Sequence, residues 1–170
     1  MAPTLFDSEP KPGDLIEIFR GFYQHWAIYI GENEVVHLIP PNSDSGSLDL
    51  LMFMESSTAT VRRQKVWDVI GCHDYHINNL LDEECEPHSP DVIVKEACGM
   101  VGRDLPYNIS SNNCEHFVTE LRYGKPESRQ VKRAQTLALV GGAAAAGVAF
   151  AVLGAALFSS FNKENNRNNK

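Results

Sequence analysis

The chain carries a cysteine in a setting that could make it a nucleophile. Cys114 lies in the run SSNNCEHFV, residues 110–118, where small polar residues give way to an apolar-periodic segment. This pattern predicts a helix over residues 113–123, which places the thiol in the first helical turn. Unpaired N–H groups and the positive end of the helix dipole favour a thiolate there. The alternative is an inert packed sulfur, because Cys114 shares the apolar face of the helix.

A nucleophilic thiol needs a base, and His25 and His37 lie in predicted strands that could supply one. One imidazole would remove the thiol proton and later protonate the leaving group, while a second ring would orient the first. Such a set of groups is suited to acyl transfer through a covalent acyl-cysteine. His116 lies two residues from Cys114 on the helix and points elsewhere, so we expect it to be a half-exposed residue near Glu120.

The two histidines meet only if their strands pair in one register. A three-residue loop over residues 31–33 would pair Ile30 with Glu34 and Ala27 with His37. His25 and His37 would then be diagonal neighbours on one sheet face, with Cβ atoms roughly 7 Å apart, and the cysteine helix is expected to press against that face. A slip of one residue would send them to opposite faces.

The elements that position these residues follow an α+β pattern, with short strands first and helices later. Residues 71–90 are polar and predict a long connection, and Ser89, Pro90 and Gly102 are the expected start and end signals of the first helix. Strands are predicted over residues 13–19, 25–30, 34–39 and 58–70, and helices over 89–102 and 113–123.

Four runs make the chain resemble a known family. PGDLIEIFR, QHWAIYIG, VVHL and NNCEHFVTELRYG, together with the C-terminal apolar stretch, resemble the phospholipase A and acyltransferase family, also called the H-Ras-like suppressor family, within the lecithin:retinol acyltransferase-like group. The likeness covers roughly residues 12–125. Two departures stand out: Gly21 occupies a position where the family usually has proline, and GRDL at residues 102–105 is more charged than usual.

The resemblance implies a papain-like α+β core in permuted order, with an antiparallel sheet packed against helices. It implies that Cys114 is the nucleophile, His25 the general base and acid, and His37 the ring that orients His25. It also implies calcium-independent phospholipase A1/A2 and acyltransferase activity on glycerophospholipids such as phosphatidylcholine and phosphatidylethanolamine, with no cofactor and no metal. The acyl group would pass to water, to the amine of phosphatidylethanolamine or to a lysophospholipid.

Composition narrows the choice of partners and compartment. The 170 residues are 43% hydrophobic and 22% charged, and the net charge of −7 argues against a nucleic-acid-binding protein. No secretory signal is recognisable at the N-terminus, and four scattered cysteines fit a reducing compartment. The catalytic domain is therefore expected to face the cytosol.

The C-terminal region reads as a membrane anchor. Residues 137–158 contain no charge, and a helix of that length spans roughly 30 Å, the thickness of the hydrocarbon core. We expect a single-pass transmembrane helix anchored from the cytosolic side, with a buried or interfacial helix as the alternative. Its small residues recur every fourth position and could allow self-association through Gly147, Ala151 and Ala155. The expected organisation is an N-terminal segment (1–12), a catalytic domain (13–125), a basic linker (126–136), the anchor (137–158) and a polar tail (159–170).

Two other stretches invite alternative interpretations. The run CHDYHINNLLDEECEPH offers potential zinc ligands, but their alternating order departs from structural-zinc spacing, so a solvated loop without metal is expected. These ligands would be Cys72, His73, His76, Cys85 and His88. The run LDLLMFM, residues 48–54, must either pack on the core or enter lipid.

Two other functions would suit the same residues. A cysteine protease or isopeptidase of papain-like type would use the same thiol and imidazoles on an amide. A non-enzymatic membrane tether would keep only the helix stripe and would not depend on Cys114.

Overall fold

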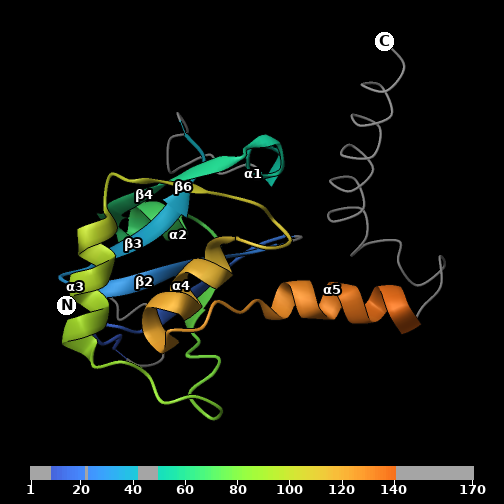
Figure 1. The fold of residues 1–170 in the computed structure, drawn as a ribbon. Coiled ribbons are helices and arrows are strands. Elements are labelled where there is room, and N and C mark those ends of the chain that lie inside the picture. Colours follow the sequence, from blue (N-terminus) through green and yellow to red (C-terminus); the bar gives the residue numbers. More distant parts are fainter. Residues whose placement is uncertain (1–8, 22, 42–49, 141–170) are drawn as a thin grey trace. The chain divides into compact units, whose positions relative to one another are not determined.

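An antiparallel six-stranded sheet forms the centre of the described chain (Figure 1). The computed structural model describes residues 9–21, 23–41 and 50–140. Strand order across the sheet is β5-β1-β2-β3-β4-β6, so the two histidine-bearing strands are central neighbours. The strands are β1 (Leu15–Arg20), β2 (Tyr23–Gly31), β3 (Glu34–Ile39), β4 (Thr58–Lys65), β5 (Asp74–Ile77) and β6 (Asp104–Pro106). The predicted α+β fold with an antiparallel sheet is confirmed.

Both predicted helices are present. Helix α3 (Pro90–Met100) follows Ser89, and α4 (Cys114–Tyr123) ends at Gly124, whose φ of 67° is the left-handed conformation that glycine adopts without strain. Helix α5 (Arg129–Val140) belongs to a second compact unit that begins at Arg129, so most of the expected basic linker is helical.

The predicted strand over residues 58–70 is wrong in its second half. β4 ends at Lys65, and α2 (Val66–Ile70) follows at once. Val66, Val69 and Ile70 recur at helical spacing and are all buried, which a strand with alternating faces could not achieve. The connection over residues 71–90 is not entirely a loop either, because it contributes the edge strand β5, which pairs with β1.

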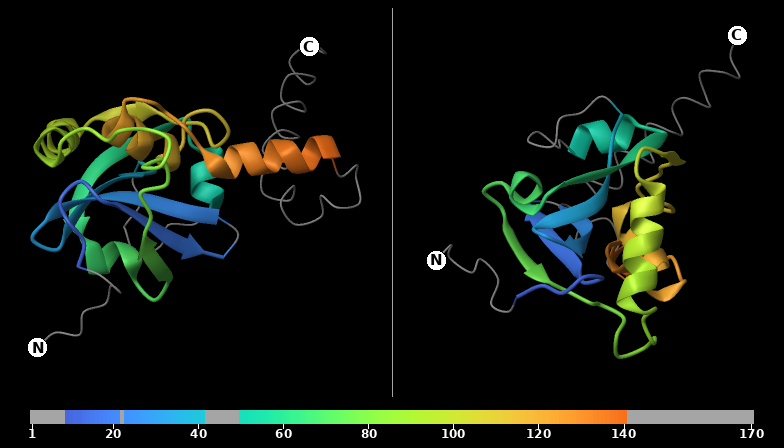
Figure 2. Two further views of the ribbon diagram at one scale, coloured as in Figure 1. Left: turned by 90° about the horizontal axis from the view of Figure 1, so that it is seen from below. Right: turned by 90° about the vertical axis from the view of Figure 1, so that its left-hand side faces the viewer.

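The sheet is covered on its two faces by different helices. One cluster joins α3 and α4 to Leu15, Trp26 and Ile28, and the other joins α2 to Ile18 and Ala27. Figure 2 shows α3 and α4 together against the sheet. Because β-strand side chains alternate, residues of β2 contribute in turn to the two cores.

The hairpin between β2 and β3 differs from the predicted loop, yet the strand register at His37 is the predicted one. Glu34 pairs with Gly31 rather than with Ile30, and Glu32 and Asn33 form a tight turn with positive φ at both residues. A two-residue turn alone would shift the register by one. A bulge between Tyr29 and Gly31 absorbs the shift, so Ala27 pairs with His37 as predicted.

The apolar run 48–54 contributes helix α1 (Leu50–Glu55). Phe53 is buried in the cluster with α3 and α4, which supports core packing for this side chain, whereas Met52 is exposed. Among the residues that the structure describes, no helix is both long and apolar enough to cross a membrane. The expected anchor over 137–158 lies outside the described residues except for its first four positions, which are the end of α5.

Candidate active site

The structure brings His25 and His37 into direct contact. Both side chains are fully buried, and His25 Nε2 lies 2.8 Å from His37 Nδ1. Their rings meet edge to face, at 81° between planes. The antiparallel register sets this geometry, because His25 lies two residues from Ala27, the partner of His37 across the ladder.

Gln64, which was not predicted from the sequence as a site residue, adds a third group to the histidine pair. Gln64 on β4 places its Oε1 2.6 Å from His37 Nε2, so both ring nitrogens of His37 are engaged. Gln64 stands opposite Val35, two residues from His37 on the same face of β3. Finding it from sequence would have required the register between β3 and β4, which are separated by the long segment 40–57.

Burial keeps both imidazoles neutral. The pKa of His37 falls from 6.5 to about 4, first because burial penalises the imidazolium, and further because Arg20 and Arg62 are nearby; only the hydrogen bond to Gln64 opposes the shift. The pKa of His25 is also well below its ordinary value, because of burial and then His37 and Arg20. At neutral pH, His25 is therefore a neutral imidazole, and its ring nitrogen without a proton can accept one.

The start of α4 is fixed by a reciprocal cap. The Asn113 side chain accepts hydrogen bonds from the backbone N–H groups of Glu115 and His116, and the Asn113 N–H donates to His116 Nδ1 at 3.2 Å. His116 is thus part of the capping box, a role the sequence interpretation missed although it separated His116 from catalysis. The cap holds the first turn, and with it Cys114, in one orientation.

Cys114 lies against the strand that carries His25. Its Sγ–H points to the carbonyl of Gln24 at 3.8 Å, and the backbone N–H of Trp26 is also close enough to favour its thiolate. The structure thus places the sulfur beside the residues that immediately precede and follow His25. The pairing of β2 with β3 stops at Ala27. The Cys114 contact therefore occurs on a part of β2 that is no longer paired with β3.

The predicted arrangement of the faces needs a correction. His25 pairs with Ile18 and therefore points to the α2 face, whereas Phe117 and Val118 of α4 pack on the opposite face with Trp26. The helix does not press on the histidine face. The first turn of α4 reaches β2 beside His25, where the Cys114 sulfur contacts the carbonyl of Gln24.

The expectation of a resting thiolate is also wrong. Burial raises the pKa of Cys114 to about 12, and nearby Glu115 adds to the shift. The backbone N–H groups of the helix start and of Trp26 act in the opposite direction but are outweighed, because a fully enclosed sulfur loses the solvation that stabilises its charge. The resting site is a neutral thiol near neutral imidazoles.

Aromatic rings enclose the site. Phe53 of α1 lies 6.0 Å from the His25 ring, 6.3 Å from Tyr23 and 5.2 Å from Tyr107, measured between ring centroids. Burial raises the pKa of Tyr107, and the nearby Cys114 raises it further, so its hydroxyl stays protonated. Phe53 therefore lies against His25, whose side chain is fully buried.

Two of the potential zinc ligands, His76 and Cys85, contact other residues. His76 lies 3.0 Å from Glu17, and Cys85 lies 3.7 Å from the Lys125 amine. Within the described ranges, no three metal-binding side chains come together, so the structure supplies no ligand set there.

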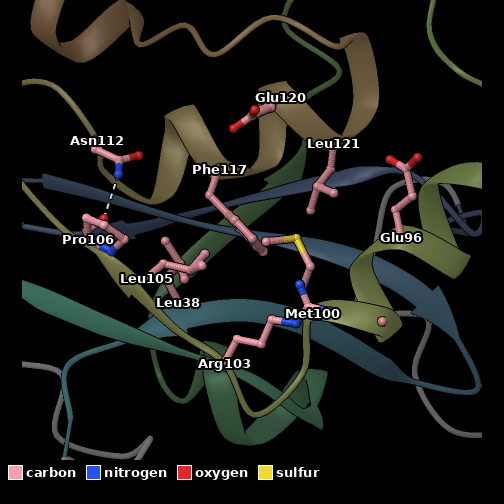
Figure 3. Close-up of a pocket in the computed structure, with 11 residues that line it drawn as sticks. Leu38, Glu96, Met100, Arg103, Leu105, Pro106, Asn112, Phe117, Glu120 and Leu121 are labelled. Atoms are coloured by element: carbon pink, nitrogen blue, oxygen red, sulfur yellow. Dashed lines mark hydrogen bonds between the residues drawn. The ribbon is translucent and has the colours of Figure 1, made fainter.

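A cavity of about 520 Å³ is lined by residues of α3, α4, β3 and β6, and none of the three candidate triad residues lines it. Figure 3 shows Phe117 of α4 and Met100 of α3 pointing toward one another across it, with Leu38 and Leu105 at one side. Arg103 and Leu105, from the run at residues 102–105, line this cavity.

Known proteins are similar in sequence to most of this chain. A family model described as lecithin retinol acyltransferase matches residues 8–127. Phospholipase A and acyltransferase 4 of Homo sapiens is 50% identical over 128 residues, which cover 75% of this chain and 78% of that protein. Phospholipase A and acyltransferase 3 of Mus musculus is 45% identical over 147 residues, covering 86% and 88%. Phospholipase A and acyltransferase 1 of Homo sapiens is 43% identical over 129 residues, covering 76% and 77%.

Proposed function

The chain belongs to the lecithin retinol acyltransferase family, and we propose that it is a calcium-independent phospholipase A1/A2 and acyltransferase that acts on glycerophospholipids through an acyl-cysteine. The observation that carries the proposal is the neutral, buried His25–His37 pair beside the thiol at the start of α4. The relatives' names supply the substrate class. The permuted papain-like relationship fits the chain order, in which the histidine strands precede the cysteine helix.

The first half-reaction opens an ester at the sn-1 or sn-2 position. Cys114 Sγ attacks the carbonyl carbon as His25 takes the thiol proton, which gives a tetrahedral oxyanion and an imidazolium. The imidazolium then protonates the departing alkoxide, the C–O bond breaks, and a lysophospholipid leaves. The acyl group stays on Cys114 as a thioester. The backbone N–H of Cys114, in the first turn of α4, is suited to stabilise the oxyanion, whereas the N–H groups of Glu115 and His116 donate to the Asn113 side chain.

The second half-reaction returns the enzyme to its starting state. Water, the amine of phosphatidylethanolamine or a lysophospholipid hydroxyl attacks the thioester while His25 accepts its proton. The C–S bond then breaks, and the thiolate recovers that proton. Fatty acid, an N-acylated phospholipid or a new phospholipid results. His37 orients His25 through the hydrogen bond between Nε2 and Nδ1.

The high thiol pKa shapes this mechanism. A site that disfavours both thiolate and imidazolium cannot hold a resting ion pair, so we infer that proton transfer accompanies attack on the bound ester. The thiol therefore becomes an effective nucleophile only when a substrate ester is bound. This behaviour limits reaction with other electrophiles when no lipid is bound.

Mass spectrometry tests the proposal directly. The full-length protein is incubated with vesicles of phosphatidylcholine and phosphatidylethanolamine that carry distinct sn-1 and sn-2 labels, and both the lipids and the intact protein are analysed. We expect a transient mass increase of one acyl group on Cys114, and Cys114→Ala should abolish adduct and turnover alike. Cys98→Ala, which removes a thiol on α3 away from the site, is the matched control.

Other outcomes would point elsewhere. Full turnover by Cys114→Ala would refute a thiol enzyme. Cleavage of a fluorogenic peptide panel without lipid turnover would favour the protease alternative, and no turnover of either substrate would favour the tether.

We propose further that residues 137–158 anchor the protein in a bilayer with the catalytic domain on the cytosolic side, and that two copies associate through Gly147, Ala151 and Ala155. The absence of charge over this stretch supports the anchor. Extraction of membranes with alkaline carbonate should leave the full chain in the pellet and release a chain that ends at residue 136. Release of both would contradict an integral anchor.

A further inference from the structure

His37 is held between two hydrogen-bonding groups, one on each ring nitrogen. These contacts determine which of its nitrogens carries the proton, in addition to orienting His25. Its Nδ1 faces His25 Nε2 at 2.8 Å, and its Nε2 faces Gln64 Oε1 at 2.6 Å. Both histidines are fully buried. An imidazole in such a chain can choose between two neutral tautomers only if the groups at both ends allow it.

Gln64 allows only one of these two tautomers of His37. An amide oxygen only accepts, so His37 Nε2 carries the proton and donates it to Gln64. His37 is neutral, so its Nδ1 is then bare and accepts from His25. His25 must accordingly carry its proton on Nε2, and its Nδ1 is left without one.

The remaining nitrogen is the one that the chemistry needs. His25 Nδ1 is buried and has no hydrogen-bond partner among the described residues. A buried polar atom without a partner costs free energy and is uncommon in a folded protein. Here the unpaired atom belongs to the residue whose neighbours, Gln24 and Trp26, contact the Cys114 sulfur.

We propose that Gln64 is a positioning residue that acts through His37 to hold His25 in the tautomer with a bare Nδ1, the atom that accepts the Cys114 proton. The inference rests on the proposed function for its catalytic meaning, but the tautomer itself is a property of the resting protein. Gln64 contacts His37, and its effect on His25 is exerted through that ring.

The neutrality of Gln64 matters as much as its oxygen. Arg20 on β1 and Arg62 on β4 both disfavour an imidazolium at His37, and an amide in the third position adds no negative charge to offset them. A carboxylate there would stabilise protonated His37. A protonated His37 would donate from Nδ1 to His25, which would force the His25 proton onto Nδ1 and block the base.

Two variants separate the hydrogen bond from the charge. Gln64→Leu removes the acceptor, so both histidines can adopt the opposite tautomer. Gln64→Glu keeps the acceptor and adds a charge. Thr60→Val is the matched control, because Thr60 lies on the same strand and face and loses a comparable side-chain hydrogen bond, to Asp104, without touching the histidines.

The first readout is independent of activity. Full-length protein labelled with ¹⁵N-histidine in detergent micelles is studied by NMR, with signals assigned through His25→Gln and His37→Gln. We expect Nε2–H on both histidines in the wild type and in Thr60→Val, and a substantial shift of His25 to Nδ1–H in Gln64→Leu. An Nδ1–H on wild-type His25, or tautomers unchanged by Gln64→Leu, would overturn the proposal.

The second readout is the pH profile of acyl release from phosphatidylcholine vesicles. Gln64→Leu should lower kcat at least tenfold at every pH with little change in KM. Gln64→Glu should be close to wild type at alkaline pH, and its acid limb should move up by about 1 to 3 pH units. Equal losses in both variants at all pH values would indicate a merely structural role. If the tautomers agree but no variant, including wild type, acts on lipid, only the proposed function fails.

Discussion

The buried histidine pair predicts an unusually steep loss of stability in mild acid. Above pH 6.5, the ordinary pKa, His37 is neutral in both the folded and the unfolded chain and contributes no pH dependence. As the pH falls, the unfolded chain binds a proton first, whereas the folded protein does not until about pH 4. Protonation therefore favours the unfolded state, and stability present above pH 6.5 is lost between pH 6.5 and about 4.

The size of the effect follows from the shift. A pKa lowered from 6.5 to about 4 corresponds to about 3 kcal/mol when the loss is complete, and about 2 kcal/mol of this is lost by about pH 5. His25 adds a loss of the same sign, because its pKa is lowered too. Carboxylates with lowered pKa values, such as Asp82, contribute mainly at lower pH.

Replacing His37 isolates its share. We expect His37→Gln to be less stable than wild type near pH 7.5, because the ring packing is lost, but to lose about 2 kcal/mol less on acidification to about pH 5. Urea unfolding of the full-length proteins at the two pH values, with m-values compared, measures the difference. Wild type and variant losing the same free energy, within about 0.5 kcal/mol, would show that His37 is not held neutral, and the reasoning on the base would fall with it.

Substitutions at three further positions test how α4 is held, all by urea unfolding of the full chain. Asn113→Ala should cost about 1 kcal/mol through the lost cap and should lower kcat, whereas Asn113→Asp should keep the cap and lose only the donation from Nδ2 to the Ile109 carbonyl at 2.8 Å and to Ser128. Asp82→Ala should cost about 1–2 kcal/mol, because the half-exposed carboxylate accepts hydrogen bonds from Arg122 at 2.9 and 3.1 Å; a neutral effect would show that this anchor is dispensable. Gly124→Ala should cost about 1 kcal/mol or more, because its positive φ disfavours a side chain and a Cβ would lie 3.3 Å from the His88 ring.

The sequence was most informative where local rules decide the structure. Asn113 before the cysteine and Gly124 after the helix set the two ends of α4, since caps and left-handed glycines act within a few residues. The pairing of Ala27 with His37 was also predictable, because alternation leaves few registers that bury both strands. These two features are enough to nominate all three residues of the candidate triad.

Features that depend on distant contacts could not be predicted in this way. The bulge beside Ile30 and the tight turn at Glu32 and Asn33 have opposite effects on register, so a wrong loop length still gave the right histidine pair. Helix α2 follows Lys65 directly, with no glycine, proline or asparagine to mark the end of β4. Gln64 joins the site only through the pairing of β3 with β4, across a segment whose length says nothing about register.

The state of the thiol shows why the first turn of a helix does not by itself activate a cysteine. The dipole and the free N–H groups are worth on the order of 1 kcal/mol at such a position, whereas complete burial raises the Cys114 pKa from 9.0 to about 12. The same enclosure lowers the pKa of both histidines, so it opposes charge on either partner of an ion pair. Activation must therefore come from the reaction itself, when a bound ester offers the sulfur a carbon to attack and the proton an imidazole that is already neutral.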